Sequence, residues 1–218
     1  MYSQMKHLII IGARGFGRCV YSIAKSMDSY NREFDIKGFL DDKSDALSEY
    51  QNYPPILDSV ESYIIQKDDV FICALGDVFY KEKYTEIILN KGGEFLSVIH
   101  PTACINQNVH IGKGCVVACG VMLDSDVEVN DFVCIQAYAV IGHDVKVGKW
   151  SILDCQTFVG GFTTIGERVT VHTGTKIIPN IHIADHATIN AGSIVIRNVK
   201  KDSVVMGNPA REMIIPKK

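Results

Sequence analysis

The stretch that decides the fold is VNDFVCIQAYAVIGHDVKVGKWSIL, residues 129–153, in which every sixth residue is Val, Ile or Leu. The same spacing extends from Ile99 to Val195 through seventeen successive positions. The residue four places after each of these is small or aliphatic and never charged. An α-helix needs an apolar period near 3.6 residues, so this pattern excludes a helix.

A period of six with two inward positions describes a short strand followed by a corner, and stacked units of this kind form a parallel β-helix. Three hexads make one triangular coil of eighteen residues, so the chain has between five and six coils. Residues eighteen apart are then expected about 4.8 Å from one another on neighbouring coils. We place this β-helix domain at residues 99–200.

The first part of the chain, residues 1–98, has a different pattern. Apolar runs at 6–12, 35–42, 68–76 and 94–100 predict strands, and amphipathic segments at 16–27 and 78–92 predict helices. This alternation predicts a small parallel-sheet, Rossmann-like α/β domain. Residues 201–218 are predicted to leave the prism as a C-terminal tail.

Composition narrows the class of protein. The formal net charge is −3 and no basic cluster occurs, so we expect no nucleic-acid partner. The apolar run Leu8–Ile11 is too short for a signal peptide or a membrane span, so we expect a cytoplasmic protein without a membrane partner. The seven cysteines include no CxxC, and His182 and His186 lie in a non-helical segment, so we expect no metal.

A glycine-rich turn, GARGFGR at residues 12–18, lies between the first predicted strand and helix. Backbone amides at such a turn can bind an anion, although the spacing G-x-x-G-x-G is not that of a dinucleotide fold, and a plain tight turn is the alternative. Asp41, Asp42 and Gly76 follow two further strands, and ligands of parallel sheets bind at those ends. An acidic pair suits sugar hydroxyls, an amino group or base N–H donors.

His143 and Asp144 occupy a corner where Ile141 and Val145 already fill the inward positions. The stacking offset places Gly161 beside His143 on the next coil. A histidine, an orienting carboxylate and a backbone amide donor are what an acyl-transfer site needs. The alternative is a solvent-exposed corner histidine followed by a turn.

The same offset aligns Phe132 with Trp150 on one edge of the prism. Such an aromatic edge indicates a protein interface or, as the alternative, a ligand wall.

The chain resembles the hexapeptide-repeat sugar acyltransferases through GARGFGR, FLDD, ALGD, HPTA, the hexads, GHD and GNPARE. Within that family it is most similar to the N-acetyltransferases of UDP-4-amino sugars and the sialic acid O-acetyltransferases. The resemblance implies a left-handed β-helix, a homotrimer, acetyl-CoA as co-substrate between neighbouring prisms, and a nucleotide-sugar acceptor in surface-glycan biosynthesis. It implies no acyl-enzyme, because the acceptor attacks the thioester directly.

The resemblance also implies roles for particular residues. His143 is the expected base, with Asp144 strengthening it. The expected sugar-nucleotide contacts are Gly12, Arg14, Gly15, Phe16, Asp41, Asp42 and Gly76. The expected acetyl-CoA contacts are Gly161, Thr173, Ala191, Gly207, Asn208, Pro209, Ala210 and Arg211.

Two residues depart from the family pattern. Phe16 stands where a histidine is common in the glycine turn, so a polar contact to the substrate is either lost or replaced by stacking there. Ile152 stands where many members have a second histidine that contacts the acetyl thioester. The transferred group can therefore be acetyl or a different acyl group, and slower turnover is a further alternative. Sialic acid O-acetylation and a non-catalytic sugar-nucleotide-binding trimer remain alternatives, whereas the α/β domain disfavours acetylation of serine or xenobiotics.

Overall fold

The computed structural model describes residues 5–213. The chain divides into two compact units, one up to Pro101 and one from Thr102 onward. Residues 214–218, the end of the predicted tail, and residues 1–4 of the predicted α/β domain lie outside the described residues.

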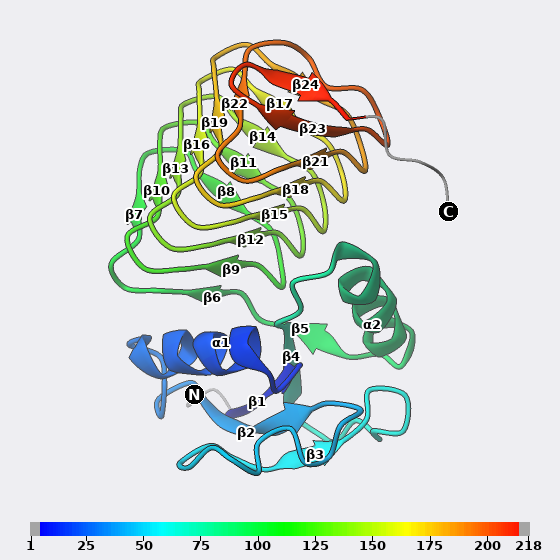
Figure 1. The fold of residues 1–218 in the computed structure, drawn as a ribbon. Helices are drawn as coiled ribbons and strands as arrows, with labels where there is room; N and C mark the ends of the chain where they lie inside the picture. Colours follow the sequence, from blue (N-terminus) through cyan, green and yellow to red (C-terminus); the bar gives the residue numbers. More distant parts are fainter. Residues whose placement is uncertain (1–4, 214–218) are drawn as a thin grey trace. The chain divides into compact units, whose positions relative to one another are not determined.

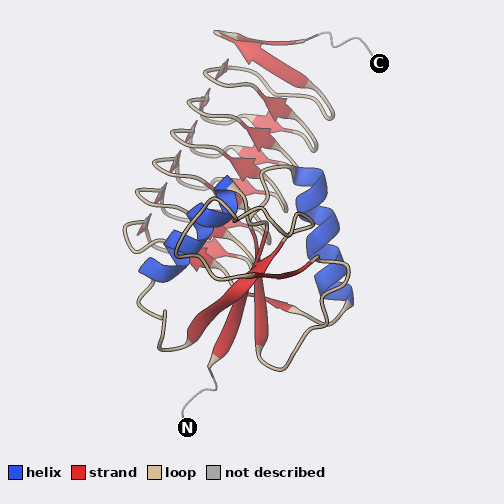
Figure 2. Cartoon of the chain, turned by 60° about the horizontal axis from the view of Figure 1, so that its bottom comes forward, coloured by secondary structure: helices blue, strands red, loops and turns tan. Residues whose placement is uncertain are grey.

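The first unit contains a five-stranded parallel sheet in the order β3-β2-β1-β4-β5. Two crossovers run outward from β1 and β4 in opposite directions, and Figure 2 shows a helix to either side of the sheet. This is the predicted parallel α/β domain. Its elements are β1 (Lys6–Ile11), α1 (Gly15–Ser26), β2 (Phe34–Leu40), β3 (Ile56–Asp58), β4 (Asp69–Cys73), α2 (Val78–Asn90) and β5 (Glu94–Phe95).

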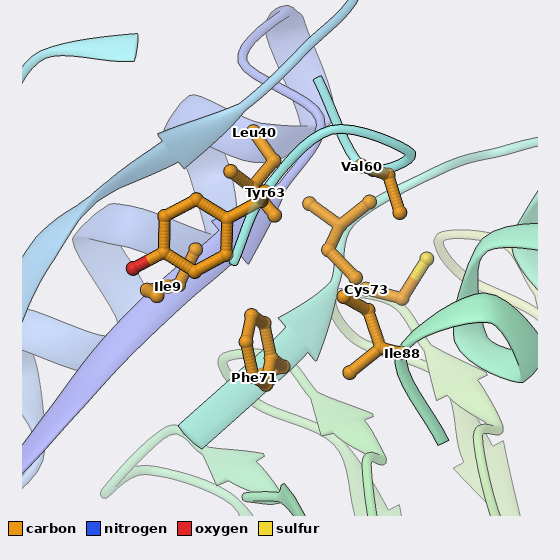
Figure 3. Close-up of a cluster of buried hydrophobic side chains, with 8 residues drawn as sticks. Ile9, Leu40, Val60, Tyr63, Phe71, Cys73 and Ile88 are labelled. Carbon is orange, nitrogen blue, oxygen red and sulfur yellow. The ribbon is translucent and has the colours of Figure 1, made fainter. Parts of the chain in front are cut away.

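The core of this unit lies on both faces of the sheet because successive strand residues point in opposite directions. Ile9 and Ile11 of β1 pack with Phe71 of β4 and Ile88 of α2, as Figure 3 shows for the labelled residues of this cluster. Leu8 and Ile10, the alternate residues of β1, are also fully buried. A strand that is buried on both faces has no polar alternation, which explains the continuous apolar run of β1.

Two details of the first unit differ from the sequence prediction. β3 was not predicted, because only three residues after two prolines form it and Ile56 is only partly buried. The last predicted strand, 94–100, is divided into β5 and β6 (Val98–Ile99). Such short segments have no periodicity by which sequence patterns can place them.

The second unit is the predicted parallel β-helix, drawn in Figure 1 as stacked coils with strands in three rows. From β6 to β19 (Lys176–Ile177), each strand pairs in parallel with the strand eighteen residues later, for example Ile135 with Leu153. The first face has β7 (Cys104–Ile105), β10 (Met122–Leu123), β13 (Val140–Ile141), β16 (Phe158–Val159), β19 (Lys176–Ile177) and β22 (Ile194–Val195). The second face has β8 (His110–Ile111), β11 (Glu128–Val129), β14 (Lys146–Val147), β17 (Thr164–Ile165) and β20 (His182–Ile183).

The third face includes β9 (Val116–Val117), β12 (Cys134–Ile135), β15 (Ile152–Leu153), β18 (Thr170–Val171) and β21 (Thr188–Ile189). We call the segments that follow first-face strands, such as residues 142–145, the first corner. The second corner follows second-face strands, as at 148–151, and the third corner follows third-face strands, as at 154–157.

The predicted inward positions form the core of the prism. Ile141, Val147 and Leu153 are fully buried, and the hydroxyl of the buried Ser151 donates to the Gly166 carbonyl at 2.8 Å. Small hydroxyl residues are tolerated inside because each can donate to a corner carbonyl. The first coil is the exception, because Ile105 is 41% exposed and the other inward residues of this coil are only partly buried, namely Ile99, Ala103, Val109 and Ile111.

The predicted tail is wrong in its first part. Residues from Lys201 do not leave the prism, because β23 (Val204–Gly207) pairs in parallel with β21. β24 (Ala210–Glu212) then pairs antiparallel with β23. The hexad repeat ends at Val195, but the exposed edge of β21 still offers backbone hydrogen bonds, and β23 satisfies them.

Candidate functional site

A cavity of about 490 Å³ lies in the first unit at the carboxyl ends of the parallel strands. Ligands of open α/β sheets bind at this edge. The residues that line it are Ile11, Gly12, Arg14, Phe16, Leu40, Asp41, Asp42, Val60, Ala74, Leu75, Gly76, Asp77, Tyr80 and Tyr84. The structure thus brings together six of the seven predicted substrate residues, and Gly15 is the one that does not line the cavity.

The glycine turn carries the chain from β1 into α1 beside this cavity. A Cβ atom on Gly17 would overlap the Gly12 carbonyl, so only glycine permits the close approach of helix and strand. No side chain caps the first turn of α1, where Arg14 is the N-cap residue. The amides at this helix end are therefore available to an anionic group.

The two aspartates at the end of β2 have different partners. Asp41 accepts hydrogen bonds from the backbone N–H groups of Ala13, at 2.9 Å, and Lys43, at 3.0 Å. Asp42 accepts a hydrogen bond of 2.7 Å from the Tyr84 hydroxyl. Burial and this bond raise the pKa of Tyr84 well above its ordinary value, so the phenol stays protonated. Asp41 therefore ties the glycine turn to the loop after β2. Asp42 lines the cavity and has a second carboxylate oxygen with which a ligand can bond.

Sequence reasoning missed two aromatic residues of this cavity, Tyr80 and Tyr84. Asp77 caps α2 through the N–H groups of Phe79, at 2.9 Å, and Tyr80, at 3.1 Å. Tyr80 and Tyr84 are stacked, with ring centroids 6.2 Å apart. Their spacing of four on a helix places them on one face, which was the signal available in the sequence.

His143 and Asp144 form a hydrogen-bonded pair in the first corner of the prism. His143 Nδ1 lies 2.8 Å from Asp144 Oδ2, and the two side chains are 51% and 43% exposed. An ionised carboxylate can only accept, so Nδ1 carries the proton. In the neutral imidazole Nε2 has a free lone pair, and no described residue hydrogen-bonds to it.

Gly161 lies directly beside this imidazole, as the eighteen-residue offset predicted. A Cβ atom on Gly161 would be 2.7 Å from Nε2 of His143 and 2.8 Å from Cε1. The carbonyl of His143 accepts from the amide of Phe162 at 3.0 Å, and the two rings meet edge to face at 4.9 Å. The buried Gly161 amide makes no hydrogen bond to any described residue, so it is available as a donor.

A second carboxylate near His143 was missed. Asp124 accepts hydrogen bonds from Asn106 Nδ2 at 3.0 Å and from the Ser125 amide at 2.8 Å. These bonds, with a smaller contribution from the charge of His143, lower the pKa of Asp124. Asp124 lies eighteen residues before Gly142, the residue next to His143, so the coil offset could have placed this carboxylate near the imidazole.

The predicted cofactor residues do not gather around His143 within one chain. Thr173 and Ala191 are exposed residues of the third corner, at the other edge of the first face. Gly207–Arg211 form the hairpin between β23 and β24, where the Gly207 amide donates to Ser193 Oγ at 3.2 Å. Ile152 of β15 is buried in the third face, at 1% exposure.

Phe132 and Trp150 are stacked in the second corner, as predicted. Their ring centroids are 5.9 Å apart and the rings are within 13° of parallel. The guanidinium of Arg168, one coil further, lies 4.8 Å from the Trp150 ring centroid. Cation–π attraction extends the aromatic column by one coil.

Among residues 5–213, no group of three or more His, Cys, Asp or Glu side chains is arranged to hold a metal ion. Within the same range, neither helix has the length and apolar character that crossing a membrane requires.

Comparison with known proteins gives two family matches. Residues 7–88 match the PglD N-terminal domain, and residues 94–191 match the GMPPB C-terminal domain. GDP-perosamine N-acetyltransferase of Escherichia coli O157:H7 is 26% identical over 148 residues, which cover 66% of this chain and 67% of that protein. The chain is thus similar to the hexapeptide-repeat sugar acyltransferases.

The family fold extends over nearly the whole chain. PerB from Caulobacter crescentus, solved in complex with CoA and GDP-perosamine, superposes with a TM-score of 0.85 at 23% identity, covering 94% of this chain and 96% of PerB. The predicted α/β domain followed by a left-handed parallel β-helix is confirmed.

A serine acetyltransferase of Buchnera aphidicola is 33% identical over 120 residues, covering 54% of this chain and 38% of the relative. The chain thus spans between 38% and 60% of the length of the serine acetyltransferases it matches.

Proposed function

We propose that this protein transfers the acetyl group of acetyl-CoA to an amino group of a nucleotide-linked sugar, with His143 as general base. The observation that carries the proposal is the His143 imidazole, whose Nδ1 is held at 2.8 Å by Asp144 while Nε2 is free beside the Gly161 amide. The similarity to GDP-perosamine N-acetyltransferase supports the class of acceptor.

In this mechanism the acceptor amine attacks the thioester carbonyl directly, in a ternary complex that holds both substrates in place. His143 Nε2 takes the proton that the amine loses, and Asp144 stabilises the imidazolium that forms. The Gly161 amide donates to the carbonyl oxygen as negative charge develops there. The C–S bond then breaks, the sugar amide forms, and CoA leaves as the thiol after taking a proton.

The cavity of the first unit binds the nucleotide part of the acceptor in this proposal. The uncapped N-terminus of α1, with Gly12 and Arg14 of the cavity lining, receives the diphosphate. Asp41, Asp42 and Gly76 supply acceptors for ribose hydroxyls or base N–H groups, and Phe16 stacks where the family commonly has histidine.

The proposed enzyme is a homotrimer of parallel prisms. Thr173 and Ala191 lie on the third corner and His143 on the first, so residues expected to share one acetyl-CoA come from different edges of the prism. A neighbouring copy that places its third corner beside the first corner would bring them together. Acetyl-CoA then lies between copies, with Gly207–Arg211 near its distal part.

Two alternative functions remain beside this proposal. In the first, the protein is a sialic acid O-acetyltransferase, and His143 deprotonates an acceptor hydroxyl in place of an amine. A non-catalytic trimer that binds sugar nucleotides is the alternative from another class. We place the enzyme in the cytoplasm, where acetyl-CoA and nucleotide sugars are both available, and in surface-glycan biosynthesis.

A ligand panel with an activity measurement tests this proposal. Thermal unfolding is measured with CoA, GDP- and UDP-linked 4-amino sugars, CMP-sialic acid and free sialic acid. CoA release from acetyl-CoA is then followed with each ligand that stabilises the protein. Stabilisation by a nucleotide amino sugar together with acceptor-dependent CoA release is the expected result. Binding without CoA release would favour the non-catalytic trimer, and release with sialic acid alone would favour O-acetylation.

A further inference from the structure

A second histidine–carboxylate pair lies on the third corner, away from His143. His172 Nδ1 lies 3.0 Å from Asp154 Oδ2, and Gln136 Nε2 donates to the other oxygen, Asp154 Oδ1, at 2.7 Å. The three side chains come from successive coils, eighteen residues apart. Asp154 is 21% exposed and His172 is 41% exposed. A largely buried carboxylate therefore holds a partly exposed imidazole in one orientation.

The tautomer of this imidazole follows from its partner. An ionised Asp154 can only accept, so Nδ1 of His172 carries a proton, and in the neutral imidazole Nε2 presents a lone pair. No described residue hydrogen-bonds to this Nε2. The pair thus has the same arrangement as His143 with Asp144, but its carboxylate is anchored by a second side chain.

Other polar columns of the prism end differently. Asn106 donates to Asp124 at 3.0 Å, and Asn108 donates to Asp126 at 2.9 Å. Those amide–carboxylate columns stabilise adjacent coils without presenting a titratable nitrogen. The column of Gln136 and Asp154 repeats this arrangement and adds the imidazole, so coil stacking alone does not require His172.

The surface next to His172 is open. Thr173 is exposed, and a Cβ atom added to Gly174 or Gly192 would meet nothing within 4 Å. An extended ligand can therefore pass along this corner without displacing a side chain.

We propose that Nε2 of His172 accepts a hydrogen bond from an amide N–H of the pantetheine arm of bound acyl-CoA. This inference rests on the proposed function, which places acyl-CoA along the corner of Thr173 and Ala191. The pantetheine arm carries two secondary amides, whose N–H groups need acceptors when the arm leaves water. His172 is in this sense a binding residue for the donor substrate, whereas His143 acts on the acceptor.

Calorimetric titration with CoA tests the inference independently of acetyl transfer. His172→Ala is expected to weaken CoA binding roughly 3- to 10-fold, which corresponds to one neutral hydrogen bond. Asp154→Asn should weaken it similarly, because the proton on Nδ1 is no longer fixed. His110→Ala is the matched control, since His110 is an exposed prism histidine whose Nδ1 lies 3.0 Å from the Asn108 carbonyl oxygen, and its CoA affinity should be unchanged.

A second titration uses 3′-phosphoadenosine 5′-diphosphate, which lacks the pantetheine arm, and His172→Ala should not alter its affinity. Equal CoA affinity in wild type and His172→Ala overturns the inference and leaves the column a purely structural one. An equal loss with the fragment that lacks the arm also overturns it. If the wild-type protein does not bind CoA, the proposed function fails and the inference fails with it.

Discussion

His143 and Asp144 are neighbours in the chain, and the backbone of Asp144 turns its carboxylate back onto the imidazole that precedes it. Asp144 has a φ of 58°, in the left-handed region, and its Oδ2 lies 2.8 Å from His143 Nδ1. Aspartate tolerates this conformation better than most residues. The backbone of a single corner therefore holds the two side chains in contact, without help from a neighbouring coil.

Replacing His143 by alanine should abolish most of the activity while leaving the fold intact. The side chain is half exposed and Ile141 and Val145 fill the core without it, so the melting temperature should change little. CoA release with acetyl-CoA and a nucleotide amino sugar should fall about 10²- to 10⁴-fold, the usual contribution of a general base. His186→Ala, in the second corner, is the control, and an unchanged rate in His143→Ala would remove the base from the mechanism.

Gly161→Ala should impair catalysis through His143. The new methyl group would lie 2.7 Å from Nε2, so the imidazole must move away from the position where it accepts a proton. We expect a large fall in kcat for Gly161→Ala alone. Adding Gly161→Ala to His143→Ala should cause little further loss of kcat, because the effects of substitutions at two contacting residues do not add. Fully additive losses would show that Gly161 acts independently of the imidazole.

Asp42→Asn should weaken nucleotide-sugar binding. The substitution removes the charge that the Tyr84 hydroxyl and the ligand share, and a hydrogen bond to a charged group contributes about 1.5–3 kcal/mol. Titration calorimetry should therefore show roughly 10- to 100-fold weaker binding of the nucleotide sugar, with CoA affinity unaffected. Asp45→Asn is a suitable control, because this exposed residue of the same loop does not line the cavity. Unaltered nucleotide-sugar affinity in Asp42→Asn would exclude Asp42 from the site.

Leu153→Ala should destabilise the prism without touching the site. Leu153 is fully buried, and truncating a buried leucine costs about 2–5 kcal/mol of unfolding free energy. Lys146→Ala is the comparison, because its exposed ion pair with Glu128 at 3.0 Å contributes about 0–1 kcal/mol. Chemical denaturation measures both, and a Leu153→Ala loss as small as that of Lys146→Ala would contradict the packing of this position.

The carboxyl of Asp124 should titrate below its ordinary value of 3.8, because Asn106 and the Ser125 amide bind the ionised form. A lowered folded-state pKa means that these bonds stabilise the fold above the unfolded pKa. Their contribution is lost as the pH falls through the folded pKa. NMR titration of the carboxyl should show this pKa, and Asn106→Ala should raise it. A pKa unchanged by Asn106→Ala would assign the shift to another group.

The eighteen-residue spacing between coils predicts much of the candidate site in the prism. The offset of eighteen placed Gly161 beside His143 and Phe132 against Trp150, because every coil repeats the same register. The offset also aligns Gln136, Asp154 and His172, but alignment gives no partner or tautomer. Tyr84 and Asp42 lie 42 positions apart and on different periods, so no repeat could have paired them.

The sequence by itself determined the three-faced prism and the parallel α/β unit. Apolar spacing of six residues, continuous apolar runs and apolar spacing of 3.6 residues each leave a segment one way to bury its side chains. Only the tertiary structure decided the rest. It showed that β23 continues the sheet after the hexads end, since unpaired strand edges recruit any segment with free backbone groups. It also showed that Thr173 and His143 occupy different corners of one chain, a separation that depends on which face each strand joins.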